Sequence, residues 1–342
     1  MKKKLIVLPT LAAVILITAL VFFGRKDRNE EDVSRLVVVS PHPTDFMIPL
    51  IREFENETGV FVEIRSMGTS NAIESIRNDT NIDVLWGGSL LTVGPYTDIF
   101  YPYESPNISA FKEEFKDVGD GITCFSDVPS IIMINTDIVP GIRIEGYEDL
   151  LQDELKGRIA FASPADSSSS FEHLVNMLYV MGEGDPVKGW DYVKRLAGQL
   201  DGGLLGGSSE VYDGVAGGRY VAGLTFEEAA VTMLEKNRHV RIVYMKEGVV
   251  STPDGIYINK ASDRLDDAKR FVDFMTSKNA QTYLAKKLGR RSVRNDVDDS
   301  GLVLSYKDIN KAEVDRDTVI KNKELWTGRF MDIYKESLDE KR

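Results

Sequence analysis

The chain has 342 residues, of which 42% are hydrophobic and 28% are charged, and its formal net charge is −12. This length allows a buried core in two lobes or in one large domain. The acidic balance argues against a nucleic-acid partner, because binding to a phosphate backbone needs a basic face. A single cysteine, Cys124, excludes an internal disulfide and a metal site built on several thiolates.

The N-terminus predicts export from the cytoplasm. Three lysines precede an uncharged run from Leu5 to Phe23, which is longer than the core of a usual signal peptide and approaches the length of a membrane span. Neither a small-residue cleavage motif nor a lipobox cysteine closes the run. We interpret residues 1–28 as an uncleaved signal-anchor helix that holds the body outside the cytoplasm, and a cleaved signal peptide is the alternative.

Strands and helices alternate from residue 36 onward. The valine-rich run at 36–40 and the apolar runs at 60–66 and 82–88 predict buried strands. Between them, residues 46–59 have helical spacing that ends at a glycine, and residues 68–79 open with a capping box. This β-α-β-α-β order predicts an α/β fold with a mostly parallel sheet.

A second α/β block follows, and an amphipathic helical stripe at 265–289 comes after it. Its expected elements lie at 130–139, 158–164, 170–181, 189–200, 206–218, 220–234, 241–248 and 254–260. We assign residues 35–130 and 255–300 to a first lobe and residues 131–254 to a second, with hinge crossings near 127–131 and 249–255. The helices expected at 301–342 are not assigned to either lobe.

The loops after the predicted strands form the main functional signal. Ligands bind at the carboxyl ends of strands in open parallel sheets, and these loops carry serine, threonine and glycine. Three of them, at 41–45, 68–71 and 166–170, run directly into helices, whose free N–H groups bind anions. A phosphate or phosphonate group is therefore the predicted ligand at this end. The residues expected to bind it are Ser40, His42, Thr44, Thr69, Ser70, Gly88, Ser89, Ser167, Ser168, Ser169, Ser208 and Ser209.

Several of the residues assigned to ligand binding also have a purely structural interpretation. His42 either adds a positive charge near neutral pH or is a turn residue between two prolines. The serines at 167–170 either bind the anion or only cap a helix, and Ser208 and Ser209 are equally typical of a turn.

Acidic residues are expected at the other, polar end of the ligand. Glu227 is preferred to Glu228, because alternation from Thr225 places Glu227 on the cleft side of a strand, and Glu210 is a weaker candidate. Trp86 either stacks on a sugar ring or packs in the core. A pocket that binds phosphate at one end and presents carboxylates at the other suits a sugar phosphate, or 2-aminoethylphosphonate with its amine.

Eight stretches, taken in order, resemble a known family. They are VVSPHP, FENETGVFVEIRSMGTS, DVLWGG, INTDIV, ASPADSSSSFEHL, VAGGRYVAGLTFEEAA, ASDRLDDAKRFVDFMTS and LGRRSVRNDV, and they extend from about Leu36 to Val297. They are similar to the extracytoplasmic solute-binding proteins of ABC importers, in the iron(III)/phosphonate/hexose-phosphate branch of the type II periplasmic-binding fold. They also resemble the hexose-phosphate sensor lipoproteins of some Gram-positive bacteria, although the lipobox cysteine is missing here.

The resemblance implies a two-lobed clamshell that closes on its ligand, works as a monomer without a cofactor and serves an ABC permease or a membrane sensor kinase. Hexose phosphate is favoured, with iron(III) and 2-aminoethylphosphonate as alternatives. Iron-binding members resemble one another in an adjacent tyrosine pair, and this sequence has none. The sequence also lacks a G-x-S-x-G elbow, a Walker loop and an H-E-x-x-H motif, so we expect a binding protein without catalytic residues and not an enzyme.

Overall fold

The strands form one hydrogen-bonded network in the computed structural model, which describes residues 35–116, 118–119, 121–139, 141–200, 203–236, 238–299 and 301–339. We use the names lobe 1 and lobe 2 for the elements on the two sides of its central strands. Lobe 1 contains β1 (Leu36–Ser40), α2 (Thr44–Thr58), β2 (Val62–Ser66), α3 (Thr69–Asn78), β3 (Val84–Ser89), α4 (Leu90–Val93), β4 (Phe100–Tyr101), α9 (Leu265–Met275), α10 (Lys278–Lys287) and β11 (Arg291–Ser292). It also contains the 3-10 helices η1 (Gly94–Ile99), η2 (Pro106–Ala110) and η3 (Glu113–Phe115).

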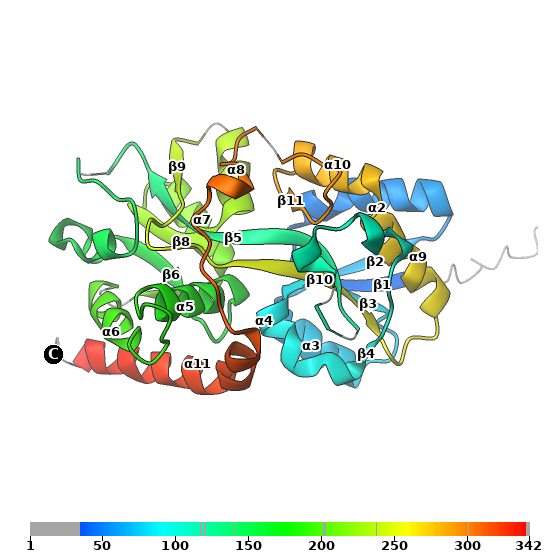
Figure 1. The fold of residues 1–342 in the computed structure, drawn as a ribbon, viewed down its shortest axis with the longest axis horizontal. Coiled ribbons are helices and arrows are strands. Elements are labelled where there is room, and N and C mark those ends of the chain that lie inside the picture. The colour runs from blue at the N-terminus through cyan, green and yellow to red at the C-terminus, as the bar shows by residue number, and fades with distance from the viewer. Residues whose placement is uncertain are drawn as a thin grey trace, which may run out of the picture. The chain divides into compact units, whose positions relative to one another are not determined.

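Lobe 2 contains η4 (Glu148–Leu151), η5 (Asp153–Leu155), β6 (Ile159–Ala162), α5 (Ser168–Val180), α6 (Trp190–Gln199), β7 (Leu204–Leu205), α7 (Ser208–Ala216), β8 (Ala222–Phe226), α8 (Glu227–Glu235) and β9 (Val240–Val243). Two longer strands, β5 (Thr123–Asn135) and β10 (Ser251–Asn259), run between the lobes (Figure 1). The chain ends with η6 (Tyr306–Asp308) and α11 (Arg316–Asp339).

The sheet is mixed, which corrects the expectation of mostly parallel pairing. Within the lobes, β1 is parallel to β2 and β3, and β6 is parallel to β7 and β8. At the centre, β10 is antiparallel to β3 and β5, and β5 is antiparallel to β8 and β9. The chain leaves lobe 1 along β5 and returns along β10, so these two neighbouring strands run in opposite directions.

The partners of β5 change at its middle. Residues up to Pro129 pair with β10 and β11, whereas residues from Ser130 onward pair with β8 and β9. The two expected hinge crossings lie at this change and at the start of β10. A hinge there, and the lobe boundaries drawn from the sequence, stay predictions.

Strand β1 is buried along its whole length because both of its faces are covered. Leu36 and Val38 of β1 pack with α2 and α9, while Val37 and Val39 pack with α3. This double burial explains the uninterrupted valine run, which is typical of a parallel strand between two helical layers. The lone cysteine, Cys124, is also buried, on β5.

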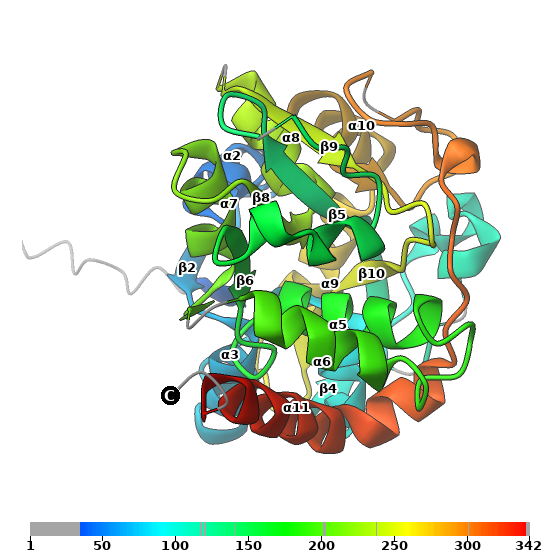
Figure 2. The ribbon, with the colours of Figure 1, turned by 90° about the vertical axis from the view of Figure 1, so that its left-hand side faces the viewer.

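The C-terminal segment contacts both lobes. Helix α11 lies along α6 of lobe 2 (Figure 2), where Trp326, Phe330 and Tyr334 belong to the core. Near the start of the same helix, Lys323 Nζ donates to the Thr92 carbonyl oxygen of α4 in lobe 1 at 3.3 Å. The segment therefore adds a contact between the lobes besides β5 and β10.

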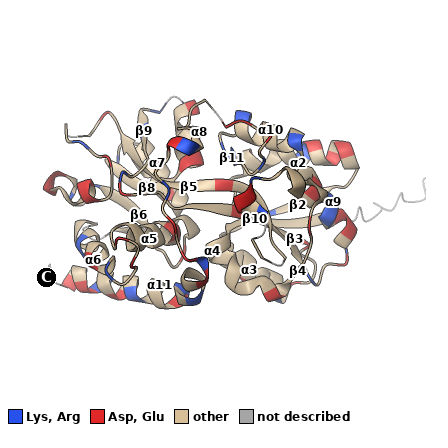
Figure 3. Cartoon of the chain, in the orientation of Figure 1, with Lys and Arg blue, Asp and Glu red and all other residues tan. Residues whose placement is uncertain are grey.

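Basic and acidic residues are mixed on the outer helices. Lys and Arg alternate with Asp and Glu along α11 (Figure 3), as its sequence shows. Within the part of the chain that the structure describes, no helix has both the length and the apolar character to cross a membrane. The expected anchor at residues 1–28 lies outside the described residues.

A substitution on β10 tests the packing of the crossing strands. A Cβ atom at Gly255 would lie 2.4 Å from Cζ of Tyr257, a fully buried residue whose hydroxyl donates to the Gly88 carbonyl oxygen. We expect Gly255→Ala to lower the free energy of unfolding by about 1–3 kcal/mol, because overpacking displaces the ring. Urea denaturation measures this change. Gly301→Ala, where a Cβ meets nothing within 4 Å, is the control, and equal effects would contradict the packing described.

Candidate ligand-binding cavity

A cavity of about 260 Å³ lies between the lobes, where the loops at the ends of β1, β2, β3, β6, β7 and β8 meet. Lobe 1 lines it with Pro41, His42, Pro43, Gly68, Thr69, Gly88, Ser89 and Arg290. Lobe 2 lines it with Asp166, Ser167, Ser168, Ser169, Glu172, Gly206, Gly207, Ser208, Ser209, Phe226 and Glu228. Val128 of β5 and Asp254 of β10 complete the wall.

Six helices of the described residues begin at this cavity. They are α2, α3 and α4 of lobe 1 and α5, α7 and α8 of lobe 2. Pro43, Gly68 and Gly207 precede three of them, and these residues form no side-chain hydrogen bond to the helix. Proline and glycine have no side-chain oxygen, so the first N–H groups of these helices remain available to a ligand. The arrangement suits an anion, because the positive ends of the helix dipoles point to one place.

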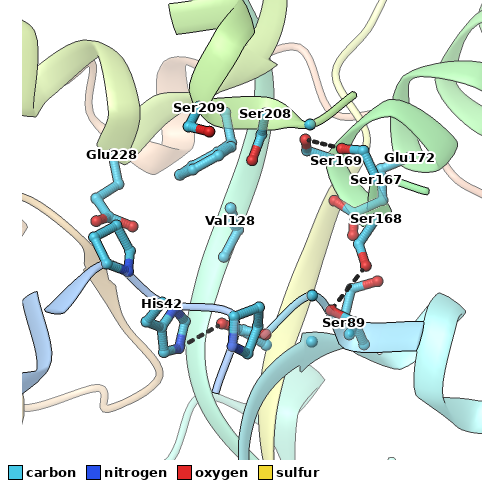
Figure 4. A pocket seen from close by; sticks show the side chains of 18 of the residues that line it. His42, Ser89, Val128, Ser167, Ser168, Ser169, Glu172, Ser208, Ser209 and Glu228 are labelled. Atoms are coloured by element: carbon cyan, nitrogen blue, oxygen red, sulfur yellow. Dashed lines mark hydrogen bonds and ion pairs between the residues drawn. The ribbon is translucent and has the colours of Figure 1, made fainter. Parts of the chain in front are cut away.

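The serine loop before α5 joins the two lobes. Ser167 Oγ accepts from the backbone N–H of Ser170 at 3.4 Å and lies 3.1 Å from Ser169 Oγ, so Ser167 caps its helix. Ser168 Oγ donates to Thr69 Oγ1 across the cavity at 3.1 Å (Figure 4). Only Ser167 is therefore the N-cap of α5, and the buried Ser170 Oγ has no hydrogen-bond partner among the described residues.

A compact ionic cluster forms another part of the wall. Arg290 binds Asp254 through Nη1 at 3.0 Å and Glu228 through Nη2 at 2.8 Å. The three side chains are only 5–6% exposed, so one guanidinium charge lies between two buried carboxyl groups, and burial raises the pKa of both. Because Glu228 belongs to lobe 2 and Arg290 to lobe 1, this ion pair also connects the lobes.

His42 lies against the same cluster, with its Nε2 3.3 Å from Asp254 Oδ2. Burial lowers the pKa of His42 well below its usual range, and the nearby positive charge of Arg290 lowers it further. The imidazole is therefore neutral at neutral pH. This corrects the expectation that His42 adds a positive charge, although the residue does line the cavity.

A second ion pair lies beside the first. Arg291 binds Glu227 through Nη2 and Oε2 at 2.8 Å and through Nε and Oε1 at 2.9 Å. Tyr244 also donates to the Glu227 carboxylate, and both members of the ion pair are almost completely buried. Two successive arginines of lobe 1 thus bind two successive glutamates of lobe 2.

A family model for bacterial extracellular solute-binding proteins matches residues 49–311, which is most of the chain. The chain belongs to this family. It is a family of binding proteins, in agreement with the expectation that the protein is not an enzyme.

Two curated relatives are similar in sequence. An uncharacterised protein of Haemophilus influenzae is 25% identical over 233 residues, which are 65% of this chain and 66% of that protein. A probable ABC transporter periplasmic-binding protein of Sinorhizobium fredii is 21% identical over 240 residues, which are 68% of this chain and 66% of that protein. Each match therefore spans slightly less than two thirds of the relative.

Solved structures show the same periplasmic-binding-protein fold. A two-component system protein that mediates signal transduction is 28% identical, with a TM-score of 0.73 over 84% of this chain and 99% of that one. The periplasmic binding protein AfuA of Actinobacillus pleuropneumoniae, with fructose 6-phosphate bound, is 22% identical, with a TM-score of 0.80 over 88% and 98%. An apo ferric ion-binding protein of Pasteurella haemolytica is 18% identical, with a TM-score of 0.74 over 88% and 98%.

The structure of this solute-binding protein gathers nine of the expected site residues at one cavity. They are His42, Thr69, Gly88, Ser89, Ser167, Ser168, Ser169, Ser208 and Ser209. Figure 4 shows Ser208 and Ser209 on the side opposite to His42 and Ser89. In the described residues, no group of three or more His, Cys, Asp or Glu side chains is placed to hold a metal ion.

Other expected residues lie outside the cavity lining, for identifiable reasons. Ser40 is buried and donates to the Trp86 carbonyl oxygen, and the Trp86 ring packs against Phe125 and Phe271 in the core. Three more residues, Thr44, Ser70 and Glu210, are exposed at the starts of their helices.

The preference for Glu227 over Glu228 is reversed in the structure. Glu228 lines the cavity, whereas Glu227 points to Arg291. The preference assumed that strand alternation continues past Thr225, but β8 ends at Phe226 and both glutamates belong to α8. The period therefore changes at the residues in question.

Sequence reasoning missed the ionisable part of the wall, namely Asp166, Glu172, Asp254 and Arg290. Asp254 lies in an apolar strand and Glu172 in a helix that is buried on all sides, and an acid in such surroundings is a usable signal. Arg290 carries no comparable local signal, because its partners lie far from it along the chain.

Two glycines of the cavity wall provide a matched test of its geometry. Gly88 has φ +92°, and a Cβ there would lie 2.7 Å from Thr69 Cγ2, whereas a Cβ at Gly68 would meet nothing within 4 Å. We expect Gly88→Ala to destabilise the protein by about 1–3 kcal/mol through backbone strain and displacement of Thr69. Gly68→Ala should cost less, up to about 1 kcal/mol, because Gly68 is the N-cap of α3 and alanine is a poorer N-cap than glycine. Thermal unfolding compares the two variants, and similar melting temperatures would contradict this geometry.

Proposed function

We propose that the protein captures a small phosphorylated ligand, with hexose phosphate favoured, between its lobes and delivers it to an ABC-type importer outside the cytoplasm. The observation that carries this proposal is the meeting of helix N-termini from both lobes at a cavity whose wall also contains buried carboxyl groups. The two kinds of wall suit the two ends of a sugar phosphate.

The helix starts suit the phosphate group. Backbone N–H groups from α3, α5 and α7 and the hydroxyls of the serine loop are all donors, which phosphate oxygens accept. Each charge-assisted hydrogen bond contributes about 1.5–3 kcal/mol, so several of them provide the ~8 kcal/mol that correspond to micromolar affinity. No unpaired arginine is required for this binding.

The ionic cluster suits the hydroxyl groups of the sugar. Glu228 and Asp254 share the Arg290 guanidinium, whose single charge offsets one of their two negative charges, and their carboxyl groups keep further lone pairs. Carboxylates accept hydrogen bonds from hydroxyls, and Arg290 supplies donors to ring or hydroxyl oxygens. This end is the basis for preferring a phosphorylated sugar to free phosphate.

Similar proteins support both the ligand and the route. The structure of AfuA contains fructose 6-phosphate, and the relative in Sinorhizobium fredii is named a probable ABC transporter periplasmic-binding protein. The two-component system protein, at 28% identity, favours a second candidate function, in which the protein senses its ligand and contacts a membrane kinase instead of a permease. Both functions use the same cavity, and the predicted signal-anchor is compatible with both.

Closure of the lobes is the proposed mechanism of capture. The hydrogen bond from Ser168 to Thr69 and the ion pair of Arg290 with Glu228 join residues of different lobes around the cavity. A ligand that contacts both walls makes all of its contacts only when the lobes are together, so binding favours the closed state. The crossing strands β5 and β10 are the proposed hinges.

Isothermal titration of the full-length protein tests the function. We expect fructose 6-phosphate or glucose 6-phosphate to bind with micromolar or tighter affinity, and inorganic phosphate to bind more weakly, because it contacts only one wall. Free fructose, 2-aminoethylphosphonate and ferric citrate complete the panel. Binding of ferric citrate or of free sugar, without binding of any phosphorylated compound, would contradict the proposal.

Substitution of the N-cap serine tests the phosphate end. Ser167→Asp and Ser167→Asn both preserve a cap for α5, because aspartate and asparagine are good N-cap residues. Only the aspartate adds a negative charge at the cavity, and we expect it to weaken sugar phosphate binding by about 100-fold through repulsion. The asparagine variant should remain within about tenfold of the wild type.

Titration of both variants, with melting temperatures to confirm folding, gives the comparison. Equal affinities for the aspartate and asparagine variants would remove the serine loop from the phosphate site.

A further inference from the structure

Glu172 occupies an unusual position for an acidic residue in an anion-binding cavity. It lines the wall and is 4% exposed, in the second turn of α5. Ser168 lies four residues earlier, so both side chains belong to the same face of the helix. Figure 4 shows Glu172 beside Ser167 and Ser168 at the end of the cavity where these helices begin.

The groups around Glu172 act on its carboxyl in opposite directions. Asp254 of β10 and Asp127 of β5 disfavour the ionised form, whereas Ser89 and Arg290 favour it. Both Nη atoms of Arg290 already bind Asp254 and Glu228, and no ion pair joins Arg290 to Glu172 in the described residues. His42, the remaining titratable group of lobe 1 at this wall, is neutral.

Burial is the largest cause, and it raises the pKa of Glu172 to about 8 against the opposing effects of Ser89 and Arg290. At neutral pH the carboxyl group is therefore mostly protonated, and one of its oxygens is a hydrogen-bond donor. A carboxylate at this place would repel a phosphate dianion, whereas a carboxylic acid adds a donor to those of the helix starts.

We infer that Glu172 determines specificity, because its carboxyl group stays protonated and donates a hydrogen bond to the phosphate group of the ligand. This inference rests on the proposed function, because it assigns a role within the same site. The proton stays on Glu172, and no bond of the ligand is formed or broken. Above the pKa of the carboxyl, the free protein must take up one proton from solution to bind.

If Glu172 must be protonated, the affinity of the protein for its ligand decreases at alkaline pH. A phosphate monoester is already a dianion at pH 7 and above, so its own ionisation contributes little there. If binding requires the protonated carboxyl, the dissociation constant rises about tenfold for each pH unit above the pKa of Glu172. A carboxylate that accepts a sugar hydroxyl would produce the opposite trend.

Proton linkage measures this requirement directly. The full-length wild-type protein is titrated with fructose 6-phosphate at pH 7 and pH 9, each in two buffers of different ionisation enthalpy. We expect close to one proton taken up per ligand bound at pH 9 and almost none at pH 7. Proton release at pH 9, or binding without proton exchange at both pH values, would overturn the inference.

Substitutions at two acidic residues of the cavity test whether Glu172 is the group that takes up the proton on ligand binding. Glu172→Gln keeps a neutral donor, so it should bind with similar affinity at pH 7 and pH 9 and take up no proton. Asp166→Asn removes another acid of the cavity wall and should keep the proton uptake, whatever its effect on affinity. Proton uptake that persists in Glu172→Gln would overturn the inference.

A second variant covers the case in which Glu172→Gln does not fold. Glu172→Met is uncharged and similar in volume, so it should lose both the proton uptake and at least about tenfold in affinity at pH 7. Full affinity and full uptake in this variant would overturn the inference. Absence of binding by the wild type at every pH would contradict the proposed function itself, whereas binding with a flat pH profile would contradict only the role of Glu172.

Discussion

Charge compensation between two arginines and two glutamates organises the site. Arg290 and Arg291 follow α10 in lobe 1, and they bind Glu228 and Glu227 at the start of α8 in lobe 2. Buried ion pairs contribute little net stability, but removal of one partner costs about 3–5 kcal/mol, because a charge is then left uncompensated. The pairs therefore fix where the two lobes meet. Asp254 binds the same guanidinium as Glu228, so the crossing strand β10 is held at this point as well.

This arrangement makes the two walls of the cavity chemically different. One wall consists of backbone N–H groups and serine hydroxyls at the starts of helices, which provide donors without a full positive charge. The other wall contains two carboxyl groups that share the Arg290 guanidinium, which provides hydrogen-bond acceptors and reduces the negative charge of the wall. A ligand with phosphate at one end and hydroxyls at the other matches both walls. Free phosphate and free sugar each match only one of them, and this difference is the physical basis of the proposed selectivity.

The sequence predicted those parts of the fold and of the site that depend on neighbours along the chain. The alternation of strands and helices, and the serine loop ahead of α5, follow from local patterns and appear in the structure. The antiparallel centre of the sheet was missed, because nothing in the composition of β5 or β10 shows that one carries the chain into lobe 2 and the other returns it. Arg290 was missed for a similar reason, since only the folded chain brings it to Glu228. The error at Glu227 arose where a strand becomes a helix, because the rule of alternation ends there.

The central claim is that helix N-termini hold the phosphate while the Arg290 cluster holds the sugar. A crystal structure of the protein with fructose 6-phosphate bound tests it most directly. The account predicts phosphate oxygens within hydrogen-bond distance of the first N–H groups of α3, α5 or α7, and sugar hydroxyls at Glu228 and Asp254. A phosphate group at Arg290, with the sugar ring among the serines, would contradict the account.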